Sequence, residues 1–242
     1  MRYELYYWPG IQGRGEYVRL ALEDAGAPYV DVARVPEKEG GGVAAMTRLL
    51  DGADTRRPPF APPFLMAGRQ LIGQTANILL FLGSRLDLAP RDAAGKLWAH
   101  QLQLTIADFL TEAHDTHHPL GPHLYYEQQR PAAKRRAKAF LAQRLPKFLD
   151  YFERVLRANA ASGPGIVGAR ISYVDLSLAQ VVAGLRYAFP SASRAALANC
   201  PRLCALHDEV FARPRLKRYL KSERRLPFNN DDLFRRYPEL DG

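Results

Sequence analysis

Cysteine is scarce in this sequence, with two cysteines in 242 residues. Cys200 and Cys204 stand four residues apart, which is neither the CxxC spacing of a redox pair nor a set of four zinc ligands. We therefore expect no redox chemistry from the protein's own thiols. Both side chains are interpreted as core or half-buried residues.

Long apolar runs are also missing. No stretch of eighteen apolar residues occurs, and the opening MRYELYYWPG lacks the uninterrupted apolar segment of a secretory signal. The composition, 47% hydrophobic and 24% charged, is typical of a soluble globular protein with an ample core. We expect a cytoplasmic protein with no membrane partner.

Nucleic-acid motifs are absent despite a net charge of +9 and a pI near 9.7. The excess of basic residues is concentrated in two groups, at 130–138 and 213–225, and neither overlaps a zinc finger, a basic zipper or a ribonucleoprotein signature. We interpret both groups as solvated helix faces and predict no nucleic-acid partner. A basic surface can still draw anionic ligands toward a cleft, as a rate effect that falls with salt.

The hydrophobic period changes along the chain. The first part predicts strands at 3–7, 29–33, 64–66 and 70–72, helices at 16–25 and 75–82, and a glycine-rich loop at 40–42. From Ala93 onward the period is 3.6, with an apolar stripe that includes Leu97, Leu104 and Phe109. We predict a small α/β domain over 1–83, a linker over 84–92 and an all-helical domain over 93–242.

Tyr7 ends the first predicted strand, and a turn punctuated by proline and glycine leads from it into the first helix. A helix start favours an anion through its unpaired N–H groups and its dipole, and a phenol nearby can donate a hydrogen bond to that anion. A thiolate is the anion this pattern suggests. A structural tyrosine is the alternative.

A second polar constellation lies in the predicted hairpin. Pro62 and Pro63 lead directly into a strand, where a cis peptide would turn backbone polar groups toward a ligand, although a simple loop proline is the alternative. Gln74 and Thr75 follow the second strand, and Thr75 is expected to be a helix N-cap able to hold a carboxylate. Capping alone would also explain this threonine.

Five segments, in order, resemble the cytosolic glutathione S-transferases of the tyrosine-type classes (pi, sigma and alpha). They are YELYYWPGIQGRGEYVRLAL, APPFLMAGRQLIGQT, TIADFL, ISYVDLSLAQVV and FARPRLKRYLKSERRLPFN. The resemblance spans nearly the whole chain. It implies a thioredoxin-like α/β domain followed by an all-helical domain, a homodimer, glutathione as co-substrate, no metal, and a bacterial source.

The resemblance also implies roles for individual residues. Tyr7 matches the tyrosine that activates the glutathione thiol, so that the thiolate attacks a small hydrophobic electrophile, with peroxide reduction or isomerisation as related reactions. Trp8, Ile11 and His118 are expected in the electrophile pocket, and Ser172 with Asp175 matches a helix-capping box. The residues implied in glutathione binding are Arg14, Pro62, Pro63, Gln74, Thr75 and Asp108, the last from the neighbouring subunit.

Two departures from the family pattern keep a second function open. Pro62 has no N–H for the hydrogen bond that this position normally donates to glutathione. The residues that meet the glycyl carboxylate have no clear counterpart, and the candidates are Lys38, Arg48, Arg56 and Arg57. The alternative is a non-catalytic protein of the same fold that binds glutathione or hydrophobic ligands.

Four histidines gather at His114, His117, His118 and His123. His114 and His118 have the helical spacing of two metal ligands, but no carboxylate follows in a zincin pattern and Pro119 is expected to end the helix just after them. We therefore predict no metal, with His118 as a pocket wall. Phe60 is either an aromatic that inserts into a partner subunit or an ordinary hydrophobic anchor.

Overall fold

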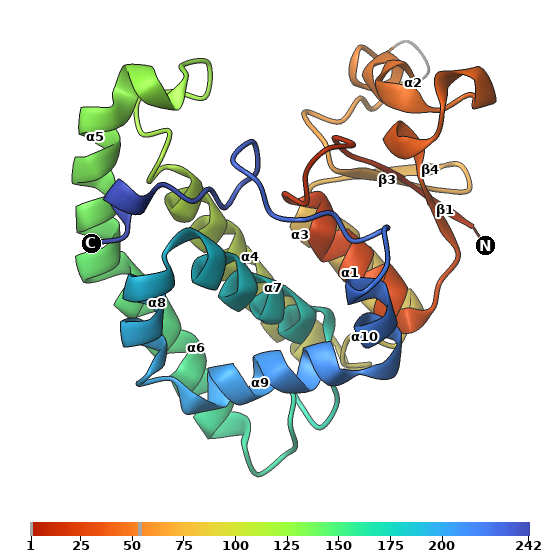
Figure 1. Cartoon of the computed structure of the whole chain (residues 1–242). Helices are drawn as coiled ribbons and strands as arrows, with labels where there is room; N and C mark the ends of the chain where they lie inside the picture. The colour runs from red at the N-terminus through yellow and green to blue at the C-terminus, as the bar shows by residue number, and fades with distance from the viewer. Residues whose placement is uncertain (1, 53–54) are drawn as a thin grey trace.

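The computed structural model describes residues 2–52 and 55–242. Figure 1 shows a small mixed domain on one side of the molecule and a larger helical domain on the other. The small domain contains the strands β1 (Tyr3–Tyr6), β2 (Tyr29–Asp31), β3 (Phe64–Ala67) and β4 (Gln70–Gly73) and the helices α1 (Gly15–Ala25), α2 (Gly42–Leu50) and α3 (Thr75–Arg85), with short 3-10 turns at Val32–Arg34 and Glu37–Glu39.

The four strands form one sheet in the order β2-β1-β3-β4. β1 pairs in parallel with β2, and β3 pairs antiparallel with both β1 and β4. Because side chains alternate across a strand, Leu5 and Leu65 face α1 and α3, whereas Tyr6 and Phe64 face the opposite side and stack at 4.8 Å. The sheet is therefore covered on both faces, as expected of an α/β domain.

The helix α2 was missed by sequence analysis, which assigned a loop at 40–42 and no helix after it. Gly40 and Gly42 have φ of 84° and 81°, so the glycines are indeed turn residues, but α2 begins at the second of them. Met46 and Leu49 bury one side of this short helix in the cluster with Tyr6 and Phe64. A nine-residue helix leaves too few periodic positions for its pattern to stand out.

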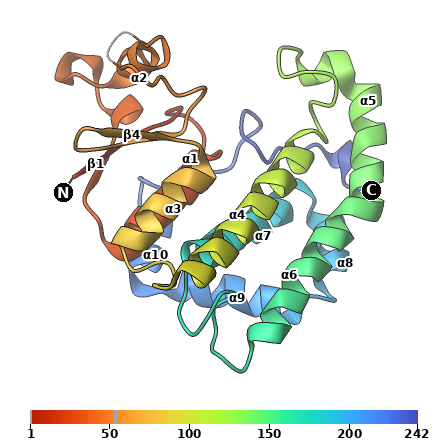
Figure 2. The same ribbon diagram turned by 180° about the vertical axis from the view of Figure 1, so that it is seen from behind.

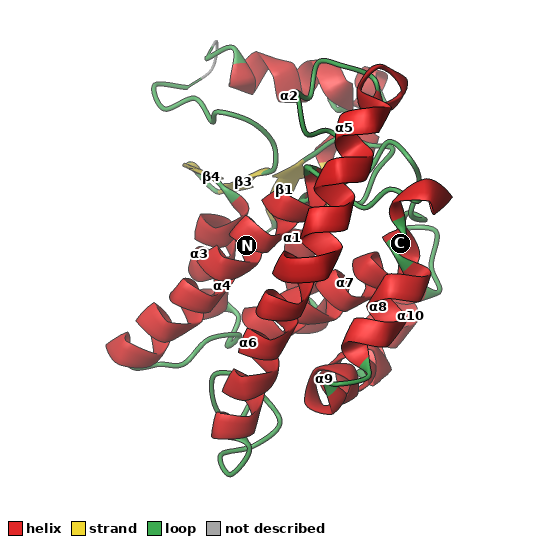
Figure 3. Ribbon diagram, turned by 90° about the vertical axis from the view of Figure 1, so that its left-hand side faces the viewer, coloured by secondary structure: helices red, strands yellow, loops and turns green. Residues whose placement is uncertain are grey.

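The helical domain begins with α4 (Ala93–His114), which Figure 2 shows alongside α3 of the small domain. A long rod follows, built from α5 (Tyr126–Ala139), a π-helical turn (Phe140–Arg144) and α6 (Leu145–Asn159). Helices α7 (Tyr173–Ala188), α8 (Pro190–Leu197), α9 (Pro201–Ala212) and α10 (Pro214–Leu220) complete the domain. Figure 3, coloured by secondary structure, shows how strongly helix predominates here.

Helix α7 forms the centre of the helical domain, since nearly all of its residues are buried. Its start is held by Asp175, whose carboxylate accepts hydrogen bonds from the backbone N–H and the hydroxyl of Ser172, both at 2.7 Å, and from the N–H of Ile166 at 2.7 Å. The predicted capping box is confirmed. It also fastens the preceding loop, through Ile166, to the core helix.

The chain after α10 has little regular structure and crosses the molecule. In Figure 1 it runs in blue from α10, past the start of α1 and the end of α4, to a final 3-10 turn (Pro238–Leu240) beside α5. Leu233, Phe234 and Leu240 are buried along it. We call residues 221–242 the C-terminal tail.

The apolar stripe predicted along α4 is only partly a core stripe. Phe109 is buried against Phe148, with ring centroids 4.4 Å apart, but Leu97 and Leu104 are 72% and 48% exposed. The prediction was wrong for the two leucines because their face of α4 points away from the rest of this chain. Within residues 2–52 and 55–242 no helix is long and apolar enough to cross a membrane.

The capping interactions of Asp175 predict a large loss of stability on truncation. We expect Asp175→Ala to lower the free energy of unfolding by about 3 kcal/mol, because buried donors on Ser172 and Ile166 lose their acceptor. Urea denaturation measures this. The matched control is Asp150→Ala, because the Asp150 side chain is 68% exposed and forms an ion pair with Arg154 on the surface. This variant should lose less than about 0.5 kcal/mol. Equal losses in the two variants would contradict the assigned role of Asp175.

Candidate functional site

Tyr7 lies directly after β1 and its side chain points at the loop that precedes α1. Its hydroxyl oxygen accepts a hydrogen bond of 2.9 Å from the backbone N–H of Arg14, one residue before the helix begins. Burial raises the pKa of Tyr7, against an opposing effect of the Arg14 hydrogen bond, so the phenol stays protonated at neutral pH. Its O–H remains free to donate, because no acceptor for it occurs within the described ranges 2–52 and 55–242.

Two glycines allow this close approach. A Cβ on Gly13 would lie 2.0 Å from the Tyr7 hydroxyl oxygen, and one on Gly15 would lie 2.6 Å from the Tyr7 ring. Gly13 also has φ of 43°, in the left-handed region that favours glycine. Both glycines are therefore needed for the phenol to reach the start of α1.

The C-terminal tail holds the same loop from the other side. The Asp232 carboxylate accepts hydrogen bonds from the backbone N–H groups of Gly13 at 2.7 Å and Gln12 at 3.1 Å. The Gln12 side chain in turn donates to the carbonyl of Leu226 at 2.5 Å and accepts from Gln180 of α7 at 2.7 Å. The loop that presents Tyr7 is thus bonded both to the tail and to the central helix.

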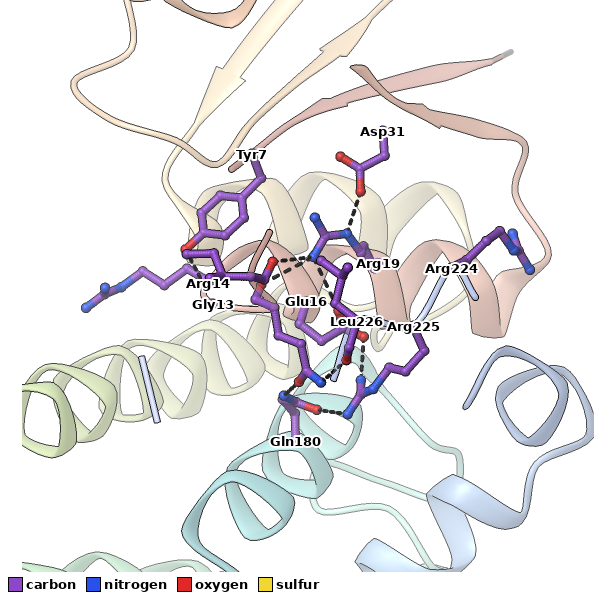
Figure 4. A network of polar contacts seen from close by, with 12 residues as sticks. Tyr7, Gly13, Arg14, Glu16, Arg19, Asp31, Gln180, Arg224, Arg225 and Leu226 are labelled. Carbon is purple, nitrogen blue, oxygen red and sulfur yellow. Dashed lines mark hydrogen bonds and ion pairs between the residues drawn. The ribbon is translucent and has the colours of Figure 1, made fainter. Parts of the chain in front are cut away.

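A buried charged network continues from this loop into α1 (Figure 4). Glu16 accepts hydrogen bonds from Tyr219 at 2.7 Å and from Arg225, and it pairs with Arg19 at 3.3 Å. Burial opposes the charge of Arg19, but Asp31, 2.7 Å away, and Glu16 hold its pKa above its ordinary value. Figure 4 also shows Arg225 meeting Gln180, at 2.9 Å, so that α1, α7 and the tail share one network.

The Arg14 side chain points away from this network in Figure 4. Its guanidinium contacts the hydroxyl of Thr111 on α4 at 3.4 Å, across the junction of the two domains. Asp108 is exposed one helical turn before Thr111. The structure therefore places both predicted residues near the junction of α1 and α4, with the Asp108 carboxylate facing solvent.

The hairpin places the other predicted ligands at the end of β4 and before β3. The peptide bond between Pro62 and Pro63 is cis, as predicted. Gln74 has φ of 66°, uncommon for a residue with a side chain and typical of functional sites. Thr75 is not the N-cap that the sequence suggested: Gln74 holds that position, and the buried Thr75 hydroxyl has no partner among the residues described.

The remaining predicted residues are dispersed around this centre. Trp8 is 41% exposed and Ile11 is half-buried in the loop after Tyr7. His118 lies beside His117, with their Nδ1 atoms 2.5 Å apart, and α4 ends at His114 instead of continuing to Pro119. The four candidates for the glycyl end, Lys38, Arg48, Arg56 and Arg57, are exposed and spread over α2 and its flanking loops.

Sequence analysis missed Asp232 and Arg225 of the tail and Tyr219 of α10 as parts of the site. Each is separated from its partner in the first twenty residues by about 200 positions, and Asp232 is 219 residues from Gly13. No local pattern signals such pairing. The useful clue was the resemblance of the C-terminal segment to a tail that closes the site, which located the segment without identifying its contacts.

Comparison with known proteins shows what this chain is similar to. The sequence model of the glutathione S-transferase C-terminal domain matches residues 114–223. The chain is 28% identical to glutathione S-transferase P 1 of Xenopus laevis over 92% of this chain and 93% of the relative. It is 22% identical to a glutathione S-transferase of Plasmodium falciparum over 91% of this chain and 95% of the relative.

The solved structure of the pi-class glutathione S-transferase of Onchocerca volvulus has a TM-score of 0.69 to this chain, with 22% identity over 91% of this chain and 93% of that one. The fold is therefore that of the glutathione S-transferases, a thioredoxin-like domain followed by a helical domain. The relatives that match over nearly their full length support a glutathione transferase enzyme. These relatives are eukaryotic, so the expected bacterial source is not confirmed.

The contact between Gly13 and Tyr7 predicts a position-specific effect within one loop. We expect Gly13→Ala to lower the free energy of unfolding by about 2 kcal/mol, because the new Cβ meets the Tyr7 hydroxyl and the backbone stays at positive φ. Gly10→Ala is the control, since a Cβ there meets nothing within 4 Å. Urea denaturation compares the two variants, and equal stability would mean that the loop does not hold Tyr7 as described.

Proposed function

We propose that this protein activates glutathione through Tyr7 and transfers its thiolate to small hydrophobic electrophiles. The observation that carries the proposal is the Tyr7 hydroxyl, which accepts from the Arg14 N–H and keeps its own proton for an outside acceptor. A thiolate sulfur placed there would accept that proton in a hydrogen bond and lie near the positive end of α1. Both effects favour the charged form of the thiol.

The thiol pKa needs to be lowered only modestly. A free thiol has a pKa of about 8.5, so only a few per cent is ionised at neutral pH, and each unit of depression corresponds to about 1.4 kcal/mol. The raised pKa of Tyr7 keeps the phenol a donor across the range in which the thiol titrates. The glutathione thiolate itself is the nucleophile, so no covalent enzyme intermediate is needed.

Polar groups near the α3 start suit the γ-glutamyl end of glutathione. The Thr75 hydroxyl is buried without a partner, and the first N–H groups of α3 lie beside it. Gln74 and the cis Pro62–Pro63 segment flank this position. The Arg14 side chain, just before α1, contacts Thr111 on α4. Their contribution would be orientation of the peptide.

We further propose a homodimer. Phe60 is 95% exposed, and Leu97 and Leu104 expose apolar side chains on α4. A second copy would cover these groups and would bring a second Asp108 toward the glutathione of its neighbour. Gel filtration with light scattering tests this, and a monomer would remove Asp108 from the site.

The alternative is a protein of the same fold that binds glutathione or hydrophobic ligands without turnover. Pro62 favours it, because its nitrogen carries no hydrogen for the bond that the position before the cis proline usually donates to glutathione. The glycyl candidates, exposed and dispersed, favour it as well. Weak affinity for glutathione with an unshifted thiol would be the signature of this alternative.

Removal of the Tyr7 hydroxyl tests the mechanism directly. An ultraviolet difference titration of bound glutathione should show a thiol pKa below its free value in the wild type and a return toward about 8.5 in Tyr7→Phe. The rate at which Tyr7→Phe conjugates glutathione to an aryl halide should fall about 10²-fold or more, which is the typical effect of removing one hydrogen-bond donor that stabilises a charge.

The control for this titration is Tyr6→Phe. The Tyr6 hydroxyl donates to Glu4 at 3.0 Å and its ring faces the other side of the sheet. The Tyr6→Phe variant should leave the thiol pKa and the conjugation rate unchanged. Glutathione bound with an unshifted thiol in the wild type would refute the enzymatic proposal and favour the binding protein.

The orphan hydroxyl of Thr75 gives a separate test of glutathione binding. We expect Thr75→Val to weaken glutathione affinity about 10-fold, because the near-isosteric side chain lacks the hydroxyl, while Thr75→Ser keeps it and binds within about 2-fold of the wild type. Calorimetry measures both. If the two variants bind equally well, the hydroxyl does not contact the ligand.

A further inference from the structure

Three histidines converge where α4 ends, and the proposed activation of the thiol assigns them no role. The side chains of His114, His117 and His118 offer nitrogen atoms that all lie within 4.8 Å of one another. His117 and His118 are buried, with 1% and 8% exposure, and the His114 side chain is 27% exposed. Sequence analysis predicted no metal because no carboxylate follows in a zincin pattern and Pro119 was expected to end the helix just after these residues. The structure ends α4 at His114, and the turn that follows brings His117 to the other two histidines.

The ring positions fit a single metal ion. The three centroid separations are 4.9 Å for His114 and His117, 5.4 Å for His114 and His118, and 4.8 Å for His117 and His118. Three imidazoles on one tetrahedral Zn²⁺, with Zn–N bonds of about 2.0–2.1 Å, hold their centroids about 5 Å apart. The His117 and His118 Nδ1 atoms are 2.5 Å apart, so these two rings must separate by under about 1 Å to share an ion.

The hydrogen bonds around the rings orient nitrogen lone pairs toward the cluster. The Nε2 of His117 lies 3.0 Å from the carbonyl oxygen of Leu233, which only accepts, so Nε2 carries the hydrogen and Nδ1 has the lone pair. That lone pair faces Nδ1 of His118, and either a proton or a cation must lie between them. Such a carbonyl partner on the far nitrogen is typical of metal-ligating histidine.

His114 likewise has a polar partner on the nitrogen that would not bind the ion. Its Nδ1 lies 3.5 Å from a carboxylate oxygen of Asp115, which leaves Nε2 for a ligand and orients the ring. The charged groups that act on the cluster are Arg14, Arg235, Asp115 and Glu127, two of each sign.

We propose that His114, His117 and His118 form a binding site for one divalent transition-metal ion of the zinc type, with three imidazole ligands and a fourth position open to solvent or ligand. Imidazole donors suit Zn²⁺, Co²⁺, Ni²⁺ and Cu²⁺ and disfavour Mg²⁺, which prefers oxygen. The proposal goes beyond the glutathione chemistry and does not depend on it. Because Leu233 of the tail holds His117, an ion there would also fasten the tail.

The experiment uses the full chain without a purification tag, since a histidine tag would bind the same ions. Calorimetry with Zn²⁺ at pH 7.5 should give one site per chain with micromolar or tighter affinity, and Co²⁺ should give the intense visible absorption of a four-coordinate ion. Mg²⁺ should give neither signal. Failure of Zn²⁺ to bind the wild type below about 100 µM would overturn the proposal.

Variants decide whether these histidines are the ligands. His114→Gln and His118→Gln should each weaken Zn²⁺ binding about 100-fold and abolish the Co²⁺ absorption, whereas exposed His123→Gln should change neither. His114 is half-exposed, so its variant is expected to fold, which circular dichroism checks. An equal loss in His123→Gln, or full Zn²⁺ binding by His114→Gln, would place the ion elsewhere and refute the site.

A readout on the tail completes the test. Saturating Zn²⁺ should slow proteolytic cleavage within residues 221–242 of the wild type at least about 3-fold and should leave cleavage of His114→Gln unchanged. The reason is that Zn²⁺ would bind only the arrangement in which the Leu233 carbonyl contacts His117, and would therefore stabilise that arrangement. Unchanged cleavage in the presence of bound Zn²⁺ would overturn the predicted link between the ion and the tail.

Discussion

The buried carboxylate of Glu16 is the interaction on which the rest of the site depends. It lies at the second residue of α1, fully buried, where the helix dipole favours a negative charge. Arg19 of the same helix, Tyr219 of α10 and Arg225 of the tail all bond to it. Leaving a buried charge without partners is costly, so these contacts together offset the burial of the Glu16 carboxylate.

This requirement has a geometric consequence for Tyr7. Once Arg225 is fixed on Glu16, the tail leaves α10 in one direction and passes over the loop before α1, where Asp232 bonds to Gln12 and Gly13. Gly13 lies against the Tyr7 hydroxyl, and the backbone N–H of the next residue, Arg14, donates to it. The position of the phenol is therefore set by the last part of the chain as much as by the strand that carries it.

The sequence predicted the parts of the site that depend on local chemistry. Tyr7 before a helix start and the cis bond between Pro62 and Pro63 were predicted from neighbouring residues, and the capping box at Asp175 was implied by the resemblance. The structure confirms the geometry of all three. The fold class followed from the change of period and from the resemblance, and the solved structures confirm it.

What the sequence could not predict is of two physical kinds. Contacts such as Asp232 with Gly13 join segments that are 219 residues apart and leave no periodic trace. Chain reversals such as the turn after His114 depend on which hydrogen bonds end the helix. The rings of His117 and His118 meet because α4 ends at His114, five residues before Pro119. The helical spacing of His114 and His118 was therefore a misleading guide, although it drew attention to the right residues.

The C-terminal tail contacts both candidate sites. Leu233, whose carbonyl orients His117, directly follows Asp232, whose carboxylate holds the loop of Tyr7. Asp232 and Leu233 are consecutive, so a single peptide unit separates the two contacts. Any coupling between the two sites would be reciprocal, with binding at each site changing the affinity of the other by the same factor. Arg14 provides a second connection, since its backbone bonds to Tyr7 and its side chain contacts Thr111, three residues before His114 on the same helix. The loop that carries Tyr7 is thus connected to the histidine cluster both by the tail and by Arg14.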